Sequence, residues 1–343
     1  MNWKAGAIRV LTSPPAVACS RRLLGRRATI FMLHRFAVPE LKLEGHPVAA
    51  VRHLLAWLRR HEFELLPLVE TLTRLKGEGP QVRGAVSFTI DDGYFDHAAV
   101  GAPVFAEFDC PVTTFVTTGF LDGRIWFWWD RIEYVFSTTR QAAIRVDLGG
   151  APFRYSLATP AERRAAQADF TGRCKAVTDE VKHEGIAALA RAAEVELPTL
   201  PPERYAPMPW ETLRACEQRG MSFGPHTVTH PILSRTSDRQ SEDEMTASWR
   251  RLKEQCRNPV PVFCYPNGQT SIDFGAREIG TLQRLGFLGA VTGDVGYSEI
   301  RQPVAAEAPF LINRFPFNED LGHSIQYAGG LELVKQTIRR PLS

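Results

Sequence analysis

Short apolar runs alternate with amphipathic segments along most of this chain. Seven runs have the length and composition of buried strands: 28–34, 84–90, 111–117, 221–225, 260–265, 287–292 and 310–314. Apolar residues recur at helical spacing in six further segments: 49–60, 68–76, 96–107, 209–219, 237–256 and 273–285. Strands that alternate with helices predict a parallel sheet, and seven or eight such units predict a barrel with its functional residues at the carboxyl ends of the strands.

Residues 120–205 interrupt this alternation, because they are too long for a simple connection. The predicted contents are an aromatic helix from Ile125, a hairpin over Ile144–Leu157, and charged helices from a capping box at Thr159 to about residue 196. The proline-rich segment Pro198–Pro209 then leads back to the barrel. We interpret this stretch as an insertion beside the barrel mouth rather than a separate domain.

Three tryptophans at the start of the insertion, Trp126, Trp128 and Trp129, have two interpretations. Indole rings can stack on the apolar faces of sugar rings. They can equally pack the insertion onto the barrel. The sequence leaves both roles open.

Polar residues of a catalytic kind cluster at the ends of the predicted strands. Asp91 and Asp92 follow the run 84–90, and His226 and His230 follow the run 221–225. Two imidazoles with one carboxylate form a nitrogen and oxygen donor set for a divalent metal ion, with coordination positions left for water. The second carboxylate is then free to act as a general base. His34, Tyr265 and Arg314 also fall near strand ends, which favours one shared site.

Three segments resemble the motifs of the polysaccharide deacetylases, the NodB-like carbohydrate esterases. Thr89-Ile-Asp-Asp-Gly93 resembles their T-F-D-D-G motif. Gly224-Pro-His-Thr-Val-Thr-His-Pro231 resembles their H-[ST]-x-x-[HDE] motif, and Phe263-Cys-Tyr-Pro-Asn-Gly268 is similar to the third motif, R-x-P-[YF]-G or F-A-Y-P-Y-G. The motifs occur in family order, and the resemblance extends over residues 28–318.

The resemblance implies an α/β fold, a distorted NodB-like (β/α)7-8 barrel over residues 28–318 with the insertion at about 120–205. A basic arm, 1–27, would precede the barrel, and a segment, 319–343, would follow it. The implied metal ligands are Asp92, His226 and His230, and the implied cofactor is a divalent ion, most often Zn²⁺. Asp91 would be the general base, and the backbone N–H of Asn267 would stabilise the oxyanion.

The chain departs from the common family pattern at the general acid and at the arginine that steadies the base. No acid histidine follows the third motif in the usual place. His34 resembles the strand-end histidine of the branch that includes poly-N-acetylglucosamine deacetylases. The usual acid histidine of the family lies in an L-x-H pattern, which His323 matches only in its letters. We expect His34 to be the acid. Cys264 stands where many members have the arginine, and Arg314 is the candidate replacement.

The function that these residues favour is metal-dependent removal of N-acetyl groups from a sugar of a polysaccharide or of a glycolipid precursor. An O-acetyl esterase on a glycan is a close alternative, because metal and base serve an ester equally well. A carbohydrate-binding pseudoenzyme would explain the missing arginine but not the retained Asp91. A glycosyltransferase would leave His226 and His230 without a role.

Composition narrows the cellular setting. The chain has 343 residues, 44% of them hydrophobic and 23% charged, as in a soluble globular enzyme. A net charge of +3 is too small to indicate nucleic-acid binding.

The N-terminal 30 residues carry six cations and no acid, which suits either an anionic membrane surface or a solvated tail. No apolar stretch resembles a signal peptide or a membrane span, so we expect a cytoplasmic protein, with membrane contact through the arm as an alternative. No oligomeric state follows from the sequence.

Overall fold

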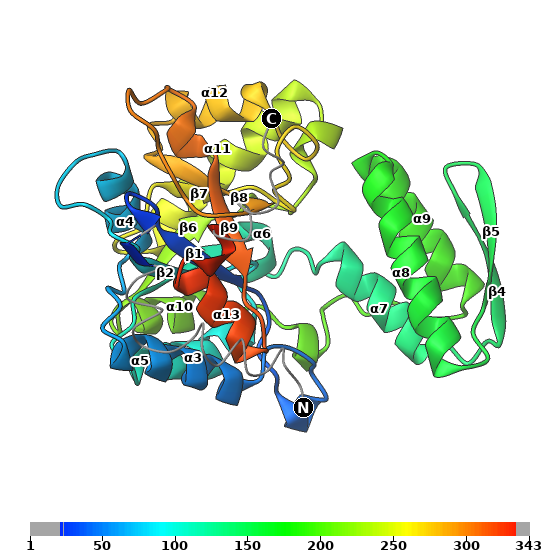
Figure 1. Cartoon of the computed structure of the whole chain (residues 1–343). Helices are drawn as coiled ribbons and strands as arrows, with labels where there is room; N and C mark the ends of the chain where they lie inside the picture. The colour runs from blue at the N-terminus through cyan, green and yellow to red at the C-terminus, as the bar shows by residue number, and fades with distance from the viewer. Residues whose placement is uncertain (1–20, 23, 334–343) are drawn as a thin grey trace, which may run out of the picture.

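A computed structural model describes residues 21–22 and 24–333, and its centre is a parallel sheet (Figure 1). The strands are β1 (Thr29–Leu33), β2 (Val86–Ile90), β3 (Val112–Val116), β6 (Met221–Pro225), β7 (Val262–Cys264), β8 (Gly289–Val295) and β9 (Ile312–Pro316). Their order is β6-β3-β2-β1-β9-β8-β7, and every neighbouring pair is parallel. The two edge strands approach each other where the N–H of Val260, two residues before β7, donates to the carbonyl of Phe223 in β6 at 2.8 Å. The sheet is therefore a nearly closed barrel of seven strands, which confirms the predicted fold class.

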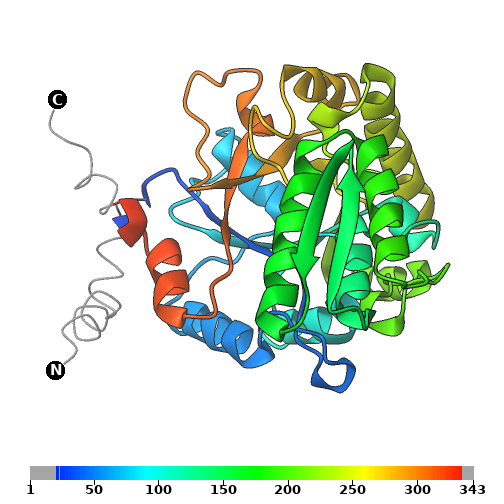
Figure 2. The ribbon, with the colours of Figure 1, turned by 90° about the vertical axis from the view of Figure 1, so that its right-hand side faces the viewer.

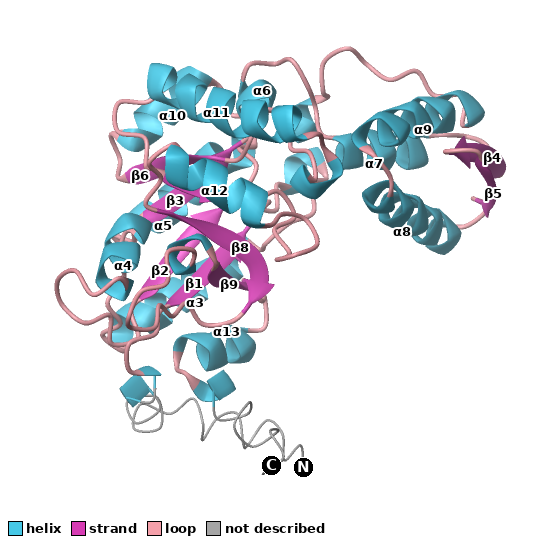
Figure 3. Ribbon diagram, turned by 90° about the horizontal axis from the view of Figure 1, so that it is seen from above, coloured by secondary structure: helices cyan, strands magenta, loops and turns pink. Residues whose placement is uncertain are grey.

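The strands are apolar on both faces because both faces are covered. All residues of β2 and β3 are buried, as expected for parallel strands between a barrel core and a helical layer. The outer layer consists of α3 (Val48–Arg60), α4 (Leu68–Leu75), α5 (Ala102–Ala106), α10 (Trp210–Glu217), α11 (Asp238–Gln255) and α12 (Ala276–Arg284). Figure 3 shows these helices around the magenta strands. The amphipathic helix α3 illustrates the packing, since it buries Val51, Leu54, Leu55 and Leu58.

The predicted helix 96–107 begins differently from the prediction. Residues His97–Gly101 form a π-turn, and only Ala102–Ala106 (α5) are α-helical. Pro103 has no N–H to donate to the carbonyl of Ala99, which removes one bond of a regular α-helix at this point.

The insertion contains every element expected of it, but its aromatic helix begins at Trp128 rather than at Ile125. These are α7 (Trp128–Thr138), β4 (Ala143–Leu148), β5 (Ala151–Ser156), α8 (Pro160–Ala176) and α9 (Asp179–Ala192). The capping box is present, because Glu162 N–H donates to Thr159 Oγ1 (3.2 Å) and Thr159 N–H donates to Glu162 Oε2 (2.9 Å). Figure 2 shows two helices flanking the hairpin in a layer beside the barrel.

The insertion has its own apolar core, separate from that of the barrel. Ile132, Phe136, Phe170, Ile186 and Leu189 are among its buried members. Trp128 is buried in this core, and Trp126 is buried in the barrel core. Trp129 is partly buried and packs against both cores. Trp126 and Trp128 therefore pack the two cores, and Trp129 keeps an exposed surface.

Both ends of the chain lie partly outside the described residues. Of the predicted basic arm, Arg27 forms an ion pair with Glu299 at 3.0 Å, and Arg21 donates to the carbonyl of His61. Residues 1–20, and with them Lys4 and Arg9, are not described. At the other end, α13 (Leu321–Ala328) follows β9. Within residues 21–22 and 24–333, no helix has the length and apolarity needed to cross a membrane.

Candidate metal and catalytic site

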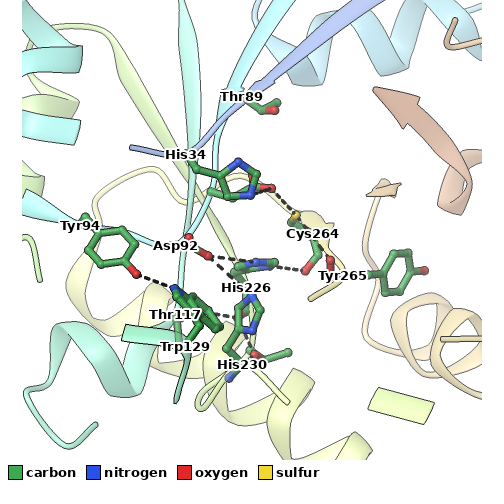
Figure 4. A network of polar contacts seen from close by, with 12 residues as sticks. His34, Thr89, Asp92, Tyr94, Thr117, Trp129, His226, His230, Cys264 and Tyr265 are labelled. Carbon is green, nitrogen blue, oxygen red and sulfur yellow. Dashed lines mark hydrogen bonds and ion pairs between the residues drawn. The ribbon is translucent and has the colours of Figure 1, made fainter. Parts of the chain in front are cut away.

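The carboxyl ends of five strands bring the predicted residues together. Asp91 and Asp92 follow β2, His226 follows β6, and His34 follows β1. Cys264 ends β7, and Arg314 lies within β9. Parallel strands place these ends at one edge of the barrel, which is the edge where barrel enzymes carry their active sites. Figure 4 shows His226 and His230 turned toward Asp92, with His34 and Cys264 nearby.

Asp92, His226 and His230 form a buried cluster with metal-ligand geometry. Asp92 Oδ1 lies 3.7 Å from His226 Nε2 and 3.6 Å from His230 Nε2. One donor atom from each residue lies within 4.8 Å of the others. Two nitrogen donors and one carboxylate oxygen around a common point are the arrangement of a three-ligand site for a divalent ion.

The protonation states of this cluster fit a bound cation. Burial and the charge of Asp91 raise the pKa of Asp92 well above its ordinary value. Burial lowers the pKa of His226 to about 4 and the pKa of His230 well below its ordinary value. Both imidazoles are therefore neutral near pH 7 and offer lone pairs. In the described part of the chain, no lysine or arginine forms an ion pair with Asp92, so its carboxylate lacks the cation that a metal would provide.

Local structure orients the two histidines. The His226 Nδ1–H donates to the carbonyl of Cys264 (2.7 Å), which directs Nε2 toward Asp92. The loop after His226 turns sharply, with Thr227 at φ 66° and His230 at φ 58°, and Asp92 itself has φ 89°. Positive φ values are costly for residues with side chains and are concentrated at functional sites.

Glu244 of α11 holds the loop between the two histidines, a role that no pattern in the sequence indicates. Its Oε2 accepts hydrogen bonds from the N–H groups of Val228 (2.7 Å) and Thr229 (2.9 Å), and its Oε1 accepts one from Thr229 Oγ1 (2.6 Å). Glu244 lies in the middle of a charged helix, where a buried glutamate has no distinguishing pattern. Only the fold brings it to the loop.

Asp91 lies beside the cluster and is paired with Arg314. Arg314 Nη1 donates to Asp91 Oδ1 at 2.8 Å, and both side chains are almost completely buried. Arg314 Nε also donates to the carbonyl of Thr292 (2.8 Å), which fixes the guanidinium. Burial alone would raise the pKa of Asp91, but the charge and the hydrogen bond of Arg314, together with the nearby His34 and His226, hold that pKa below its ordinary value. Asp91 is therefore ionised near neutral pH.

His34 lies at the open side of the site. Its Nε2 is 4.0 Å from Asp91 Oδ2, and 47% of its side chain is exposed. Partial desolvation lowers the pKa of His34, and the Asp91 carboxylate opposes that change. The other candidate acid, His323, lies on α13 and pairs with Asp320 at 3.1 Å. No contact in the described residues joins His323 to the cluster.

Asn267 lies in the loop after β7 and is exposed, with φ 56°. No carbonyl or side chain among the described residues accepts a hydrogen bond from its backbone N–H. This group is therefore available to an acceptor outside the chain.

Comparisons with known proteins agree with this geometry. Residues 183–284 match the family model of polysaccharide deacetylase, a range that contains His226, His230 and the third motif. Over this range the chain is similar to the polysaccharide deacetylases. No curated protein matches it in sequence.

Solved structures of bacterial deacetylases share the fold. The deacetylase PplD of Streptococcus pyogenes, solved with acetate, has a TM-score of 0.55 at 18% identity over 90% of this chain and 97% of that one. IcaB from Ammonifex degensii has a TM-score of 0.53 at 14% identity over 89% and 98%. A de-N-acetylase from Aggregatibacter actinomycetemcomitans has a TM-score of 0.51 at 12% identity over 86% and 96%. At these identities the likeness establishes the fold.

The wall of the site next to His230 comes from the insertion. The ring of Trp129 lies 4.7 Å from the ring of His230, edge to face. Trp129 Nε1–H donates to the Tyr94 hydroxyl (3.0 Å), which donates to Asp130 Oδ2 (2.7 Å). The aromatic run of the sequence marked Trp129, but nothing in the sequence connected Asp130 to Tyr94.

Proposed function

We propose that this protein is a metal-dependent hydrolase that removes N-acetyl groups from a sugar of a polysaccharide or of a glycolipid precursor. The observation that carries the proposal is the buried donor set of Asp92, His226 and His230 beside an ionised Asp91. A cluster with this geometry can hold a divalent cation, and an adjacent carboxylate can serve as the base that hydrolysis requires. The similarity to the polysaccharide deacetylases supports an acetylated glycan as the substrate.

Asp92, His226 and His230 would hold the divalent ion, and Zn²⁺ suits two imidazoles and one carboxylate. When bound, such an ion lowers the pKa of a coordinated water and polarises a carbonyl oxygen. Asp91 would accept the proton of the attacking water as its oxygen bonds to the acetyl carbon. Arg314 would keep Asp91 ionised and oriented for this transfer.

The second half of the reaction breaks the bond between the carbonyl carbon and nitrogen. The leaving nitrogen needs a proton, and His34 at the open side of the site would supply it, so that the products are acetate and a free amine. The unpaired N–H of Asn267 would donate to the oxygen that becomes negatively charged during the attack.

One observation favours an O-acetyl ester as a second candidate substrate. The lowered pKa of His34 leaves its imidazole largely neutral near pH 7, which weakens it as an acid. An alkoxide leaving group requires less protonation than an amide nitrogen, so an ester would be less affected.

Acetate release from matched substrates tests the proposal. The zinc-loaded protein is incubated with an N-acetylglucosamine oligosaccharide and with an O-acetylated oligosaccharide that has no N-acetyl group. We expect acetate from the first, with a free amine formed in equal amount. Acetate from the O-acetylated substrate alone would contradict N-deacetylation.

A further inference from the structure

A cleft of about 790 Å³ lies between the insertion and the barrel, apart from the metal-ligand cluster. One wall is the loop that contains Lys42 and Glu44, which follows β1. The other wall consists of α7 and α8 of the insertion, and Arg204 of the return linker completes the lining. The cleft is thus bounded by the segment after His34 on one side and by the insertion on the other.

The helix α8 presents one continuous face to this cleft. Arg163, Arg164, Gln167, Thr171 and Lys175 lie on that face, together with the small residues Ala168 and Gly172. These residues form two neighbouring rows with steps of three or four residues, so the face runs along about 22 Å of helix from Pro160 at a rise of 1.5 Å per residue. The opposite side of α8 is apolar and buries Ala166, Phe170 and Cys174 in the insertion core. The face toward the cleft is polar, and its residues are exposed or only partly buried among the described part of the chain.

The lining is predominantly positive. Five cationic side chains face two carboxylates, Glu44 and Glu133. Arg204 pairs with Glu133, and Arg163 donates to the carbonyls of Phe136 and Thr139. Across the described residues, Lys42, Arg164 and Lys175 form no ion pair and no side-chain hydrogen bond, and all three are exposed. Three cations in one cleft are thus left for an anionic ligand.

Both ends of the cleft lie close to loops of the catalytic edge. Arg35, the neighbour of His34, donates to the carbonyl of Arg204 at 2.7 Å. At the other end, burial raises the pKa of Asp273, in the loop that follows β7, and the charge of Lys175 opposes that change. A chain that binds along α8 would therefore run beside the strand ends that carry the site.

We propose that this cleft binds an acidic glycan, one that carries carboxylate or phosphate groups beside its N-acetylated sugars. Lys42, Arg164 and Lys175 would pair with the anionic groups, and Gln167 and Thr171 would hydrogen-bond to sugar hydroxyls. Ala168 and Gly172 leave room for the sugar rings. This inference rests on the proposed function for its substrate class, and it adds that the substrate is anionic.

Charge reversal with a matched control tests the cleft. Arg164→Glu/Lys175→Glu reverses two cations of the cleft. Arg145→Glu/Arg154→Glu makes the same change of charge on the exposed hairpin, where these residues are paired across β4 and β5 outside the cleft. Both pairs are made in full-length protein carrying Asp91→Asn, so that the probes are not consumed. The probes are a hexasaccharide of alternating N-acetylglucosamine and glucuronate, a phosphodiester-linked N-acetylglucosamine oligomer, and neutral N-acetylglucosamine hexamer.

We expect the cleft variant to bind an acidic probe roughly 10-fold more weakly, since two exposed ion pairs are replaced by two repulsions. The hairpin variant and the neutral probe should show unchanged dissociation constants. Added salt should weaken binding of the acidic probe to the parent protein. Whichever acidic probe shows the difference identifies the anionic group as carboxylate or phosphate.

Equal affinity of the parent protein for acidic and neutral probes would overturn the proposal, and so would equal weakening by both variants. Acetate release by the unmodified protein is measured separately. If no acetate is released although the probes bind as expected, the proposed deacetylase activity would be refuted and the assignment of the cleft would stand.

Discussion

Asp91 and Asp92 are adjacent in the chain, yet the fold gives the two carboxylates different surroundings. Asp91 receives a hydrogen bond from Arg314, which lowers its pKa. Asp92 faces two neutral imidazoles, and burial raises its pKa. Two carboxylates whose pKa values are driven apart are suited to different tasks, one as a base and the other as a ligand.

Asparagine substitutions should separate these two tasks. Asp91→Asn should retain the metal and lower kcat by roughly 10²-fold or more, the usual effect of removing a general base. Asp92→Asn should lose the metal, because it replaces an anionic oxygen with a neutral one. Elemental analysis and acetate release are measured on both variants. Loss of metal from Asp91→Asn with retention in Asp92→Asn would mean that the roles are exchanged.

His34→Ala should distinguish a general acid from a structural residue. The variant should retain metal and fold, and it should lose most of its activity on N-acetyl sugars. An aryl acetate has a leaving group that needs little protonation, so its hydrolysis should decrease much less. Equal losses on the two substrates would indicate a structural role, and full activity on the amide would exclude His34 as the acid.

Arg314 and Asp91 should stabilise the fold only when both are present. Arg314→Met leaves a buried carboxylate without a cation, which should reduce the free energy of unfolding by about 3–5 kcal/mol. Adding Asp91→Asn to Arg314→Met should recover part of the lost stability. Urea unfolding measures the free energy of unfolding of the single and the double variant. Strictly additive effects of the two changes would show that the pair is not coupled.

The pH dependence of this pair has a defined sign. The pKa of Asp91 is lowered in the folded protein, so its contribution to stability is present above the unfolded value of about 4. That contribution decreases as pH falls below this value. The difference in stability between wild type and Arg314→Met should therefore be constant near pH 7 and become smaller in acid.

At the scale of elements, the strands and helices of the barrel were predictable because burial imposes a clear pattern. The all-buried strands β2 and β3 lie within the predicted runs 84–90 and 111–117. The π-turn at His97–Gly101 was missed, because the helical spacing of its apolar residues does not reveal the effect of a proline two residues later. The role of Glu244 was also missed, because its partners are backbone groups of a distant loop.

Glu244→Gln tests whether α11 positions the histidine loop. An amide has only one oxygen to accept the bonds that the two carboxylate oxygens now accept from Val228 and Thr229. Loss of such outer contacts lowers metal affinity by roughly 10- to 100-fold. Glu242→Gln, on the exposed side of the same helix, is the matched control. If the two variants bind zinc equally well in a chelator competition, Glu244 has no role in positioning the ligands.

At the scale of the whole molecule, the sequence predicted the order of the motifs and the presence of the insertion, but not the contacts between the insertion and the barrel. The insertion folds around its own core, which its local patterns specify. The approach of Trp129 to His230 and the basic cleft beside α8 depend on the packing of two separate cores. Such contacts join residues far apart in sequence, and no local pattern encodes them.

Restoration of activity by metal tests the central claim most directly. The protein is depleted by chelation and titrated with Zn²⁺ while acetate release from an N-acetylglucosamine oligosaccharide is followed. Activity should be absent at first and should saturate at about one ion per chain, as for a three-ligand site. His226→Ala and His230→Ala should remain inactive and bind no ion at the same concentration. Full turnover by the depleted protein, or undiminished metal in His230→Ala, would contradict the account.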